Sequence, residues 1–357
     1  GHVRHGVAWF GRLAGSVDFD EYARRVVFPL SPGRAKGPVF DRAGRERAGL
    51  SREFIDEMEI TNVSRGRPPR VFSFDPFVEE RAAGRNPAGL VEYVAKDLAA
   101  VPMYFAHRED VVVAPRPSLA VLTPLHRLGI AIPQFVPDRQ SLAQRVLGAD
   151  SPWGKVDQVG RVDKLAALGL RRALLDSVDD PLWAQCEGRV VHQRADAPLG
   201  KNWIAKAPLS ASGQHRVHLQ SPTASGWLDR VLRHGPVVVE PWYERLADLS
   251  IHLDVADEGH RRVGVTRFWT AGSGAYRGAV LGPWSSGMQA DWLRALHGGG
   301  KGSRINDALS RTSDHIGAAL HEMGIRGPVG IDCMVIRQEG VVRFFPCIEV
   351  NPRHTMG

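Results

Sequence analysis

The sequence ends in FFPCIEVNPRHTMG (residues 344–357), and this stretch decides how the rest of the chain is interpreted. Glu349, Asn351 and Arg353 occupy alternate positions after an apolar run, so in a strand their side chains would share one face. Neighbouring carboxylate and amide oxygens are ligands that suit Mg²⁺ beside a phosphate. The segment therefore predicts either a strand that faces a metal and phosphate site or, in the plainer interpretation, an exposed edge strand.

The composition is that of an ordinary globular protein, with 43% hydrophobic and 24% charged residues in a chain of 357. This length predicts two or three separate parts. No run approaches the ~18 apolar residues that span a bilayer, and no secretory leader is visible, so we expect a cytoplasmic protein without a membrane partner. The three cysteines are scattered and lack CxxC spacing, which argues against a disulfide framework and a structural zinc.

The charge balance is basic, with a net charge of +7 and 39 arginines among the 46 basic residues. The arginines are dispersed along the chain, and no nucleic-acid-binding motif accompanies them. We therefore expect no nucleic-acid partner. A basic cleft for phosphate or carboxylate substrates is the more economical use of these charges.

The order of predicted elements differs between the two halves of the chain. Before residue 150, strands and helices alternate, which favours a parallel sheet covered by helices: strand 70–74, helix 86–100, strand 110–115 and helix 118–130. Residues 150–160 read as a linker. The second half favours an antiparallel sheet with helices: helices 162–177, 225–235 and 305–325, a hairpin over 203–219 with a Ser/Gly tip, strands 236–242, 248–257 and 260–272, and a final hairpin turned at Glu339-Gly340.

Three further features are candidates for chemistry. Lys206 stands just before a Ser/Gly loop, whose backbone N–H groups could approach a polyphosphate. VVVEPW (237–242) places Glu240 at the expected exposed end of a buried strand, with Trp242 as an apolar wall. Asp332 lies in the penultimate strand, so the hairpin would bring its carboxylate beside Glu349.

This order of features resembles the ATP-grasp superfamily: a lysine with a Ser/Gly loop, E-P-W after valines, G-x-D in one strand and E-x-N-x-R in the next. VDKLAALG (162–169) is similar to the entry helix of that family. The resemblance covers most of the chain after residue 70. It implies an α/β and α+β fold with an N-terminal parallel domain (1–150, of which 1–65 is hard to interpret). A small subdomain with the phosphate loop (151–245) and a large subdomain with the metal site (246–357) would follow and clasp the nucleotide.

The resemblance also implies roles for particular residues. Lys164 would help to bind the nucleotide. Its phosphates would be held by Lys206 and by the covering loop at Ser212 and Gly213, and its adenine by Glu240 and the backbone near Trp242. Asp248, which lies one position later than the usual spacing, would bind the ribose. Mg²⁺, or alternatively Mn²⁺, would be bound by Asp332, Glu349 and Asn351. Catalytic roles would fall to Arg353, which would stabilise the transferred phosphoryl group or the acyl-phosphate, and to Arg267 and Arg277 beside the acceptor.

The function implied is that of an ATP-dependent ligase, which converts a carboxylate to an acyl-phosphate and joins it to an amine. We expect small-molecule carboxylate and amine substrates, a specialised role in amino-acid-derived or peptide natural product synthesis, and a homodimer, as is common in the family. Two alternatives stay open. One is a nucleotide-binding protein without turnover on the same fold, and the other is an ATP-dependent phosphotransferase that acts on a small hydroxyl compound.

Overall fold

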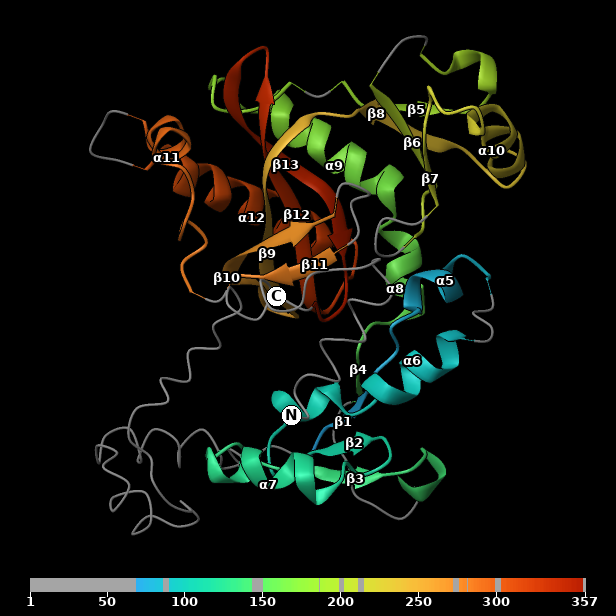
Figure 1. Ribbon diagram of the computed structural model, residues 1–357, viewed down its shortest axis with the longest axis vertical. Helices are drawn as coiled ribbons and strands as arrows, with labels where there is room; N and C mark the ends of the chain where they lie inside the picture. The colour runs from blue at the N-terminus through green and yellow to red at the C-terminus, as the bar shows by residue number, and fades with distance from the viewer. Residues whose placement is uncertain are drawn as a thin grey trace. The chain divides into compact units, whose positions relative to one another are not determined.

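The computed structural model describes residues 69–85, 90–142, 150–185, 187–198, 202–210, 215–271, 276–280, 282–298 and 303–355. The chain divides into two compact units. Of the described residues, the first unit contains 69–78 and 90–154, and the second contains 79–85 and 155–355. Figure 1 shows the elements of both. Residues 1–65, Ser212 and Gly213, all named in the predictions, lie outside the described residues.

The first unit contains a four-stranded parallel sheet in the order β3-β2-β1-β4. Its strands are β1 (Val71–Ser73), β2 (Val111–Val113), β3 (Gln134–Val136) and β4 (Asp150–Pro152), and its helices are α6 (Leu90–Leu98), η1 (Val101–Tyr104), α7 (Leu119–Arg127) and η2 (Gln140–Leu142). Short apolar strands separated by helices form such a sheet because both of its faces can be buried. The predicted parallel sheet is confirmed.

The predicted linker over 150–160 contains the boundary between the two units, which falls between Gly154 and Lys155. Most of the segment is nevertheless regular structure, because residues 150–152 pair with β1 as the edge strand β4 and Val156–Arg161 form helix α8. Trp153 between them is buried.

The second unit contains two antiparallel sheets (Figure 1). The larger has the order β11-β10-β9-β12-β13, from β9 (Glu244–Ala256), β10 (Gly259–Thr270), β11 (Tyr276–Ala279), β12 (Gly327–Gln338) and β13 (Val341–Asn351). The smaller has the order β5-β8-β6-β7, from β5 (Arg189–Val191), β6 (Trp203–Lys206), β7 (Arg216–His218) and β8 (Val237–Pro241). The helices are α5 (Val78–Ala82, whose Val78 belongs to the first unit), α8, α9 (Lys164–Asp176), η3 (Arg194–Asp196), α10 (Ala224–Val231), α11 (Ala290–His297) and α12 (Arg304–Glu322).

The two faces of the larger sheet differ sharply, because side chains alternate along each strand. Leu249, Ile251 and Leu253 of β9 point to one face and belong to the main hydrophobic core, together with residues of α9 and α12. Asp248 and Ser250 point to the other face. The polar face is therefore free to carry a site while the apolar face packs on helices.

Local signals explain where these elements begin and turn. The Asp163 carboxylate caps α9 by accepting hydrogen bonds from the N–H groups of Leu165 and Ala166. The β12–β13 hairpin turns at Glu339 and Gly340, whose φ values of 52° and 79° fit a two-residue turn of the primed type. The final hairpin and its turn were predicted correctly. No helix among the described residues is long and apolar enough to cross a membrane.

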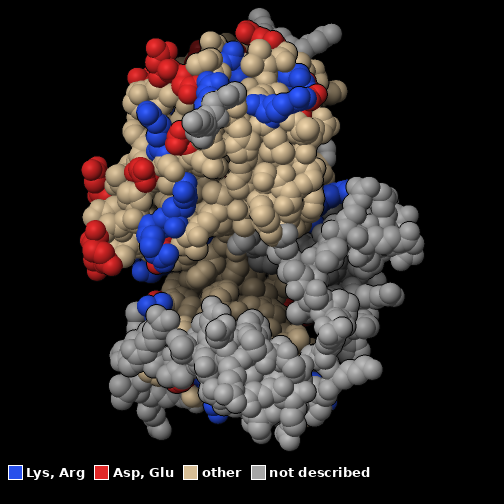
Figure 2. All heavy atoms as spheres, turned by 90° about the vertical axis from the view of Figure 1, so that its left-hand side faces the viewer, with Lys and Arg blue, Asp and Glu red and all other residues tan. Residues whose placement is uncertain are grey.

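The face of the molecule in Figure 2 carries Lys and Arg side chains interspersed with Asp and Glu around a broad area of other residues. No continuous basic stripe crosses the described part of that face.

Candidate functional site

The final hairpin brings three oxygen-bearing side chains together on the polar face of the larger sheet. Asp332 lies opposite Glu349, and Gly330 lies opposite Asn351. Asn351 Nδ2 donates to Asp332 Oδ2 at 3.1 Å, and Ser250 Oγ donates to Asp332 Oδ1 at 2.9 Å. Burial, followed by the nearby Glu349 charge, raises the pKa of Asp332 to about 7. Two crowded carboxylates, one of which holds its proton near neutral pH, form a place where a cation would be stabilised.

A β-bulge sets this geometry. Three residues of β13 separate Phe345 from Glu349, whereas a single residue of β12 separates Met334 from Asp332. Cys347, in the middle of the bulge, has a positive φ of 49°. Bulges re-aim side chains next to functional sites. Here the bulge lets an apolar pair, Met334 and Phe345, lie along the same strands as the carboxylate pair.

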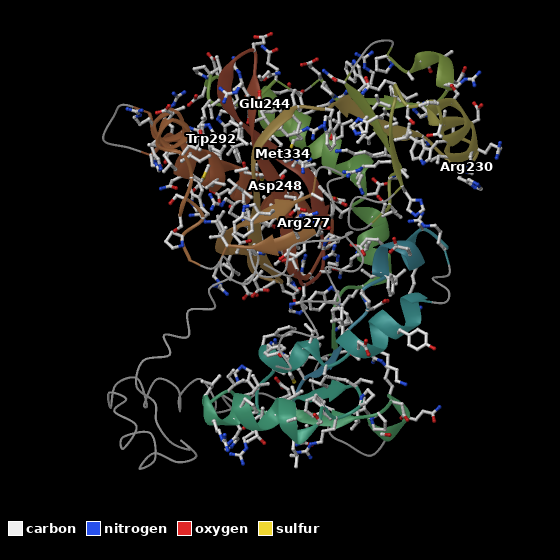
Figure 3. All side chains as sticks on the ribbon, in the orientation of Figure 1. Arg230, Glu244, Asp248, Arg277, Trp292 and Met334 are labelled. Carbon is white, nitrogen blue, oxygen red and sulfur yellow. The ribbon has the colours of Figure 1, made fainter. Side chains whose placement is uncertain are left out.

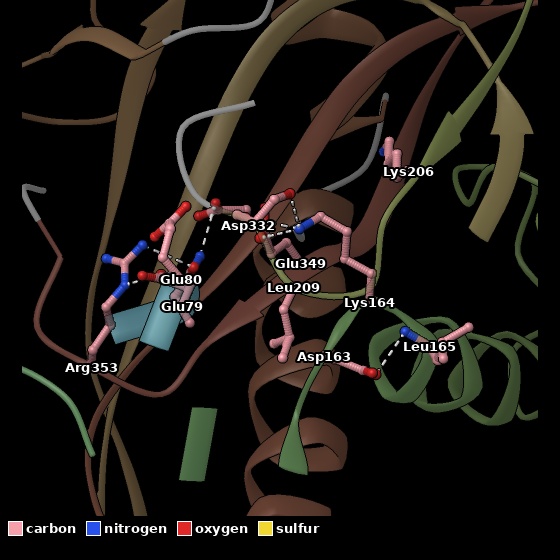
Figure 4. Close-up of polar contacts among 12 residues, drawn as sticks. Glu79, Glu80, Asp163, Lys164, Leu165, Lys206, Leu209, Asp332, Glu349 and Arg353 are labelled. Atoms are coloured by element: carbon pink, nitrogen blue, oxygen red, sulfur yellow. Dashed lines mark hydrogen bonds and ion pairs between the residues drawn. The ribbon is translucent and has the colours of Figure 1, made fainter. Parts of the chain in front are cut away.

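Lys164 supplies a positive charge to the carboxylates. Its ammonium donates to Glu349 Oε1 at 2.9 Å and to the carbonyl and hydroxyl oxygens of Ser210 at 3.0 and 3.1 Å (Figure 4). It is the first residue of α9, directly after the Asp163 cap. Lys164, Ser210, Glu349 and Asn351 border a crevice of about 10 Å³, which holds about one water molecule. The Lys164–Glu349 ion pair therefore forms part of the wall of this crevice.

The donor set fits Mg²⁺ in chemistry. Among the described residues, no group of three or more His, Cys, Asp or Glu could hold a metal. A third oxygen ligand at this place would have to come from another residue type, and the amide oxygen of Asn351 is the predicted candidate. That oxygen accepts a hydrogen bond from Arg353 Nη2 at 3.2 Å. Carboxylate and amide oxygens are ordinary Mg²⁺ ligands when water and phosphate complete the shell.

Arg353 lies beside these ligands, as the alternation of β13 predicted. Its Nε donates to the Glu79 carboxylate of α5 (Figure 4). Burial lowers the pKa of Arg353, but the Glu79 charge outweighs burial, so the pKa is raised overall. Glu79 was not predicted from the sequence, because nothing in a five-residue helix 274 residues earlier marks it as a partner.

A buried ion cluster lies where the smaller sheet meets α9. Glu240 accepts hydrogen bonds from Arg171 Nη2 at 3.0 Å and from Lys206, and it is only 4% exposed. Burial would raise the pKa of Glu240, but the charges of Lys206 and Arg171 lower it to about 2. The predicted exposed position of Glu240 is therefore wrong, because two cations enclose its carboxylate. Arg171, also missed, lies over the Phe345 ring at 4.5 Å and is 1% exposed.

Trp242 lies among cations. The guanidinium carbons of Arg216 and Arg245 lie 5.4 and 5.3 Å from its ring centroid, and His218 meets it edge to face at 4.7 Å. Burial and the Arg245 charge lower the pKa of Arg216, which the Glu349 charge partly offsets. Arg216 and Arg245 were not predicted, since a chain rich in arginine gives no signal for two of them.

Asp248 and Met334 lie opposite each other on β9 and β12, and Figure 3 labels both. Asp248 accepts a hydrogen bond from Thr270 Oγ1 at 2.8 Å and lies 3.3 Å from Arg245. Burial raises its pKa. Met334 packs with Phe345 and Tyr243. On this face of the sheet, the apolar side chain of Met334 therefore lies directly beside the charged side chain of Asp248.

Arg267, which was predicted to flank the acceptor, does not share a sheet face with Asp332. Arg267 lies opposite Leu249, a core residue, whereas its neighbour Thr266 lies opposite Ser250, which contacts Asp332. Arg267 therefore lies on the other face of the sheet. Arg277 is exposed on the edge strand β11, where Figure 3 labels it.

No family model and no curated protein matches the sequence. Among solved structures, the chain is similar to an N5-carboxyaminoimidazole synthetase from Staphylococcus aureus complexed with ADP, at 9% identity and a TM-score of 0.44, over 83% of this chain and 73% of that one. It is also similar to a protein from Archaeoglobus fulgidus described as belonging to the ATP-grasp superfamily, at 14% identity and a TM-score of 0.39, over 81% and 82%. A third is the pyruvate carboxylase of Rhizobium etli, at 13% identity and a TM-score of 0.40, over 81% of this chain and 26% of that one.

At these identities and TM-scores the likeness says nothing of the reaction, so the reaction has to be argued from the chain's own residues.

Proposed function

We propose that this protein is an ATP- and magnesium-dependent ligase that activates a carboxylate as an acyl-phosphate and joins it to an amine. The observation that carries the proposal is the convergence of Asp332, Glu349 and Asn351 on one face, with Lys164 and Arg353 on either side. This set can hold a divalent cation and a triphosphate together, which is the requirement for phosphoryl transfer.

Asp332, Glu349 and Asn351 would hold Mg²⁺, which when bound neutralises phosphate charge. Lys164, which donates to Glu349, would lie close enough to the same place to contact a phosphate oxygen. Arg353 lies on the far side of Asn351 and would stabilise the negative charge that develops on the transferred phosphoryl group.

The adenine base of the nucleotide would lie against the apolar patch of Met334, Phe345 and Tyr243, next to Trp242. Glu240 would not contact the base, since its carboxylate is enclosed. We propose instead that it positions Lys206 for the phosphates. Asp248 is the candidate residue for binding the ribose. Arg277, which is exposed on the edge strand β11, is the candidate residue for binding the acceptor.

A coupled assay tests the reaction. Purified protein with Mg-ATP is supplied with a panel of amino acids and small carboxylates, and hydroxylamine serves as the amine. A ligase forms a hydroxamate, and releases ADP and phosphate in equal amounts, only with its carboxylate. A phosphotransferase releases ADP without free phosphate, and a binding protein without turnover releases neither.

Two matched variants identify the site. Glu349→Gln should lower turnover by at least about 100-fold, since one metal ligand loses its charge. Glu258→Gln, an exposed carboxylate at the β9–β10 turn of the same sheet, should turn over like the wild type. Full activity in Glu349→Gln would remove the metal assignment.

A further inference from the structure

Arg267 lies on the opposite face of the larger sheet from the proposed nucleotide site. Its partner across the β9–β10 ladder is Leu249, part of the hydrophobic core. An arginine at such a position must either pair with an acid or bind something else, because an isolated buried charge is costly.

No acid among the described residues forms an ion pair with Arg267, whose side chain is 8% exposed. Its Nη2 donates to the carbonyl oxygen of Ser286, and its buried Nε has no hydrogen-bond partner in the described part of the chain. Burial lowers the pKa of Arg267, and no carboxylate offsets that effect. The guanidinium is thus held in place by one carbonyl while its charge and one donor are left unsatisfied.

An exposed aromatic ring and a glycine turn lie next to the Arg267 guanidinium. Its carbon lies 5.8 Å from the ring centroid of Trp269, which is 43% exposed. In the turn before α11, Gly287 has a φ of 70°, and a Cβ there would come within 3.9 Å of Arg267 Nη2. A guanidinium held by one carbonyl, without a paired acid among the described residues and beside a turn without side-chain bulk, matches the chemistry that binds an oxyanion.

We propose that Arg267, Trp269 and the turn at Ser286-Gly287 form a binding site for a small oxyanion, a carboxylate or a phosphate group, that is separate from the nucleotide site. The anion supplies the missing counter-charge. Its source is a free metabolite or the acidic group of a larger molecule, and the two anion chemistries are distinguished by experiment.

Thermal unfolding without nucleotide provides the test. The melting temperature is measured in sodium chloride, acetate and phosphate at equal ionic strength for the wild type, Arg267→Met and Arg261→Met. Arg261 is the control, because it lies on the same strand with its side chain 72% exposed. The wild type and Arg261→Met should gain melting temperature with phosphate, with acetate or with both, and the gain should level off. Arg267→Met should show no such gain.

A response to phosphate alone assigns the site to a phosphoryl group, and a response to both anions assigns it to oxyanions in general. Equal melting temperatures of the wild type in all three salts would overturn the proposal, as would an undiminished gain in Arg267→Met.

If Arg267→Met does not fold, the arginine Nε–H resonances of the wild type report directly on the same site. The Arg267 signal, assigned through Arg267→Lys, should shift and saturate during titration with phosphate or acetate. A static signal would count against the site. Because no nucleotide is present, neither result depends on the ligase reaction.

Discussion

Replacing Glu240 by Gln tests whether the buried ion cluster has the charges that the structure gives it. The Glu240 carboxylate meets both Arg171 and Lys206, and it is 4% exposed. An amide of the same shape would leave two cations facing each other without an anion. Breaking a buried ion pair by removing one partner costs about 3–5 kcal/mol. At roughly 2–4 °C per kcal/mol for a domain of ~150–250 residues, the melting temperature should fall by about 6–20 °C.

Calorimetry and urea unfolding of the wild type and Glu240→Gln measure this loss. The matched control is Glu244→Gln, which removes an exposed ion pair of 3.1 Å with Arg337 and should cost less than about 1 kcal/mol. Lys206→Met in the Glu240→Gln background should recover part of the loss, because one uncompensated cation disappears. Equal, small effects of the Glu240 and Glu244 substitutions would refute the buried cluster.

Two further predictions concern the residues that follow β13. Gly330→Ala should destabilise the protein by about 1–3 kcal/mol, since the new Cβ would lie 2.6 Å from Thr355 Cγ2. Adding Thr355→Ser, which removes that methyl group, should restore most of the urea midpoint. If the double variant is as unstable as Gly330→Ala alone, the clash is disproved. Burial lowers the pKa of His354 to about 4 although Asp254 opposes this, so the unfolded state binds the extra proton and stability should fall as the pH drops from ~6.5 towards 4. His354→Gln should flatten the melting temperature over that range, and an unchanged pH profile would contradict the assignment.

The final hairpin could be predicted because period-two alternation places Glu349, Asn351 and Arg353 on one face wherever the strand begins. The turn at Glu339-Gly340 then fixes which strand lies alongside. Asp332 followed from the same hairpin. The parallel sheet of the first unit followed from short apolar strands separated by helices. These features depend only on local pattern and on neighbours in sequence.

Arg267 and Glu240 show where local pattern fails. The face on which Arg267 lies depends on the β9–β10 register, which shifts between Arg262 and Gly264 at an irregularity that no residue pattern announces. The burial of Glu240 depends on Arg171, which reaches it from a helix 69 residues earlier. In both cases the deciding contact joins distant segments, so propensity and spacing carry no information about it.

The measurement that tests the central claim most directly is the melting temperature with and without Mg-ADP, for the wild type, Glu349→Ala and the exposed control Glu258→Ala. At about a hundred times the dissociation constant, a ligand adds about 2.7 kcal/mol, which should appear as a rise of several degrees. A nucleotide and metal site at the Glu349 strand predicts this rise, dependent on magnesium, in the wild type and in Glu258→Ala, and its loss in Glu349→Ala. No rise in the wild type, or an equal rise in Glu349→Ala, would contradict a nucleotide and metal site at the Glu349 strand.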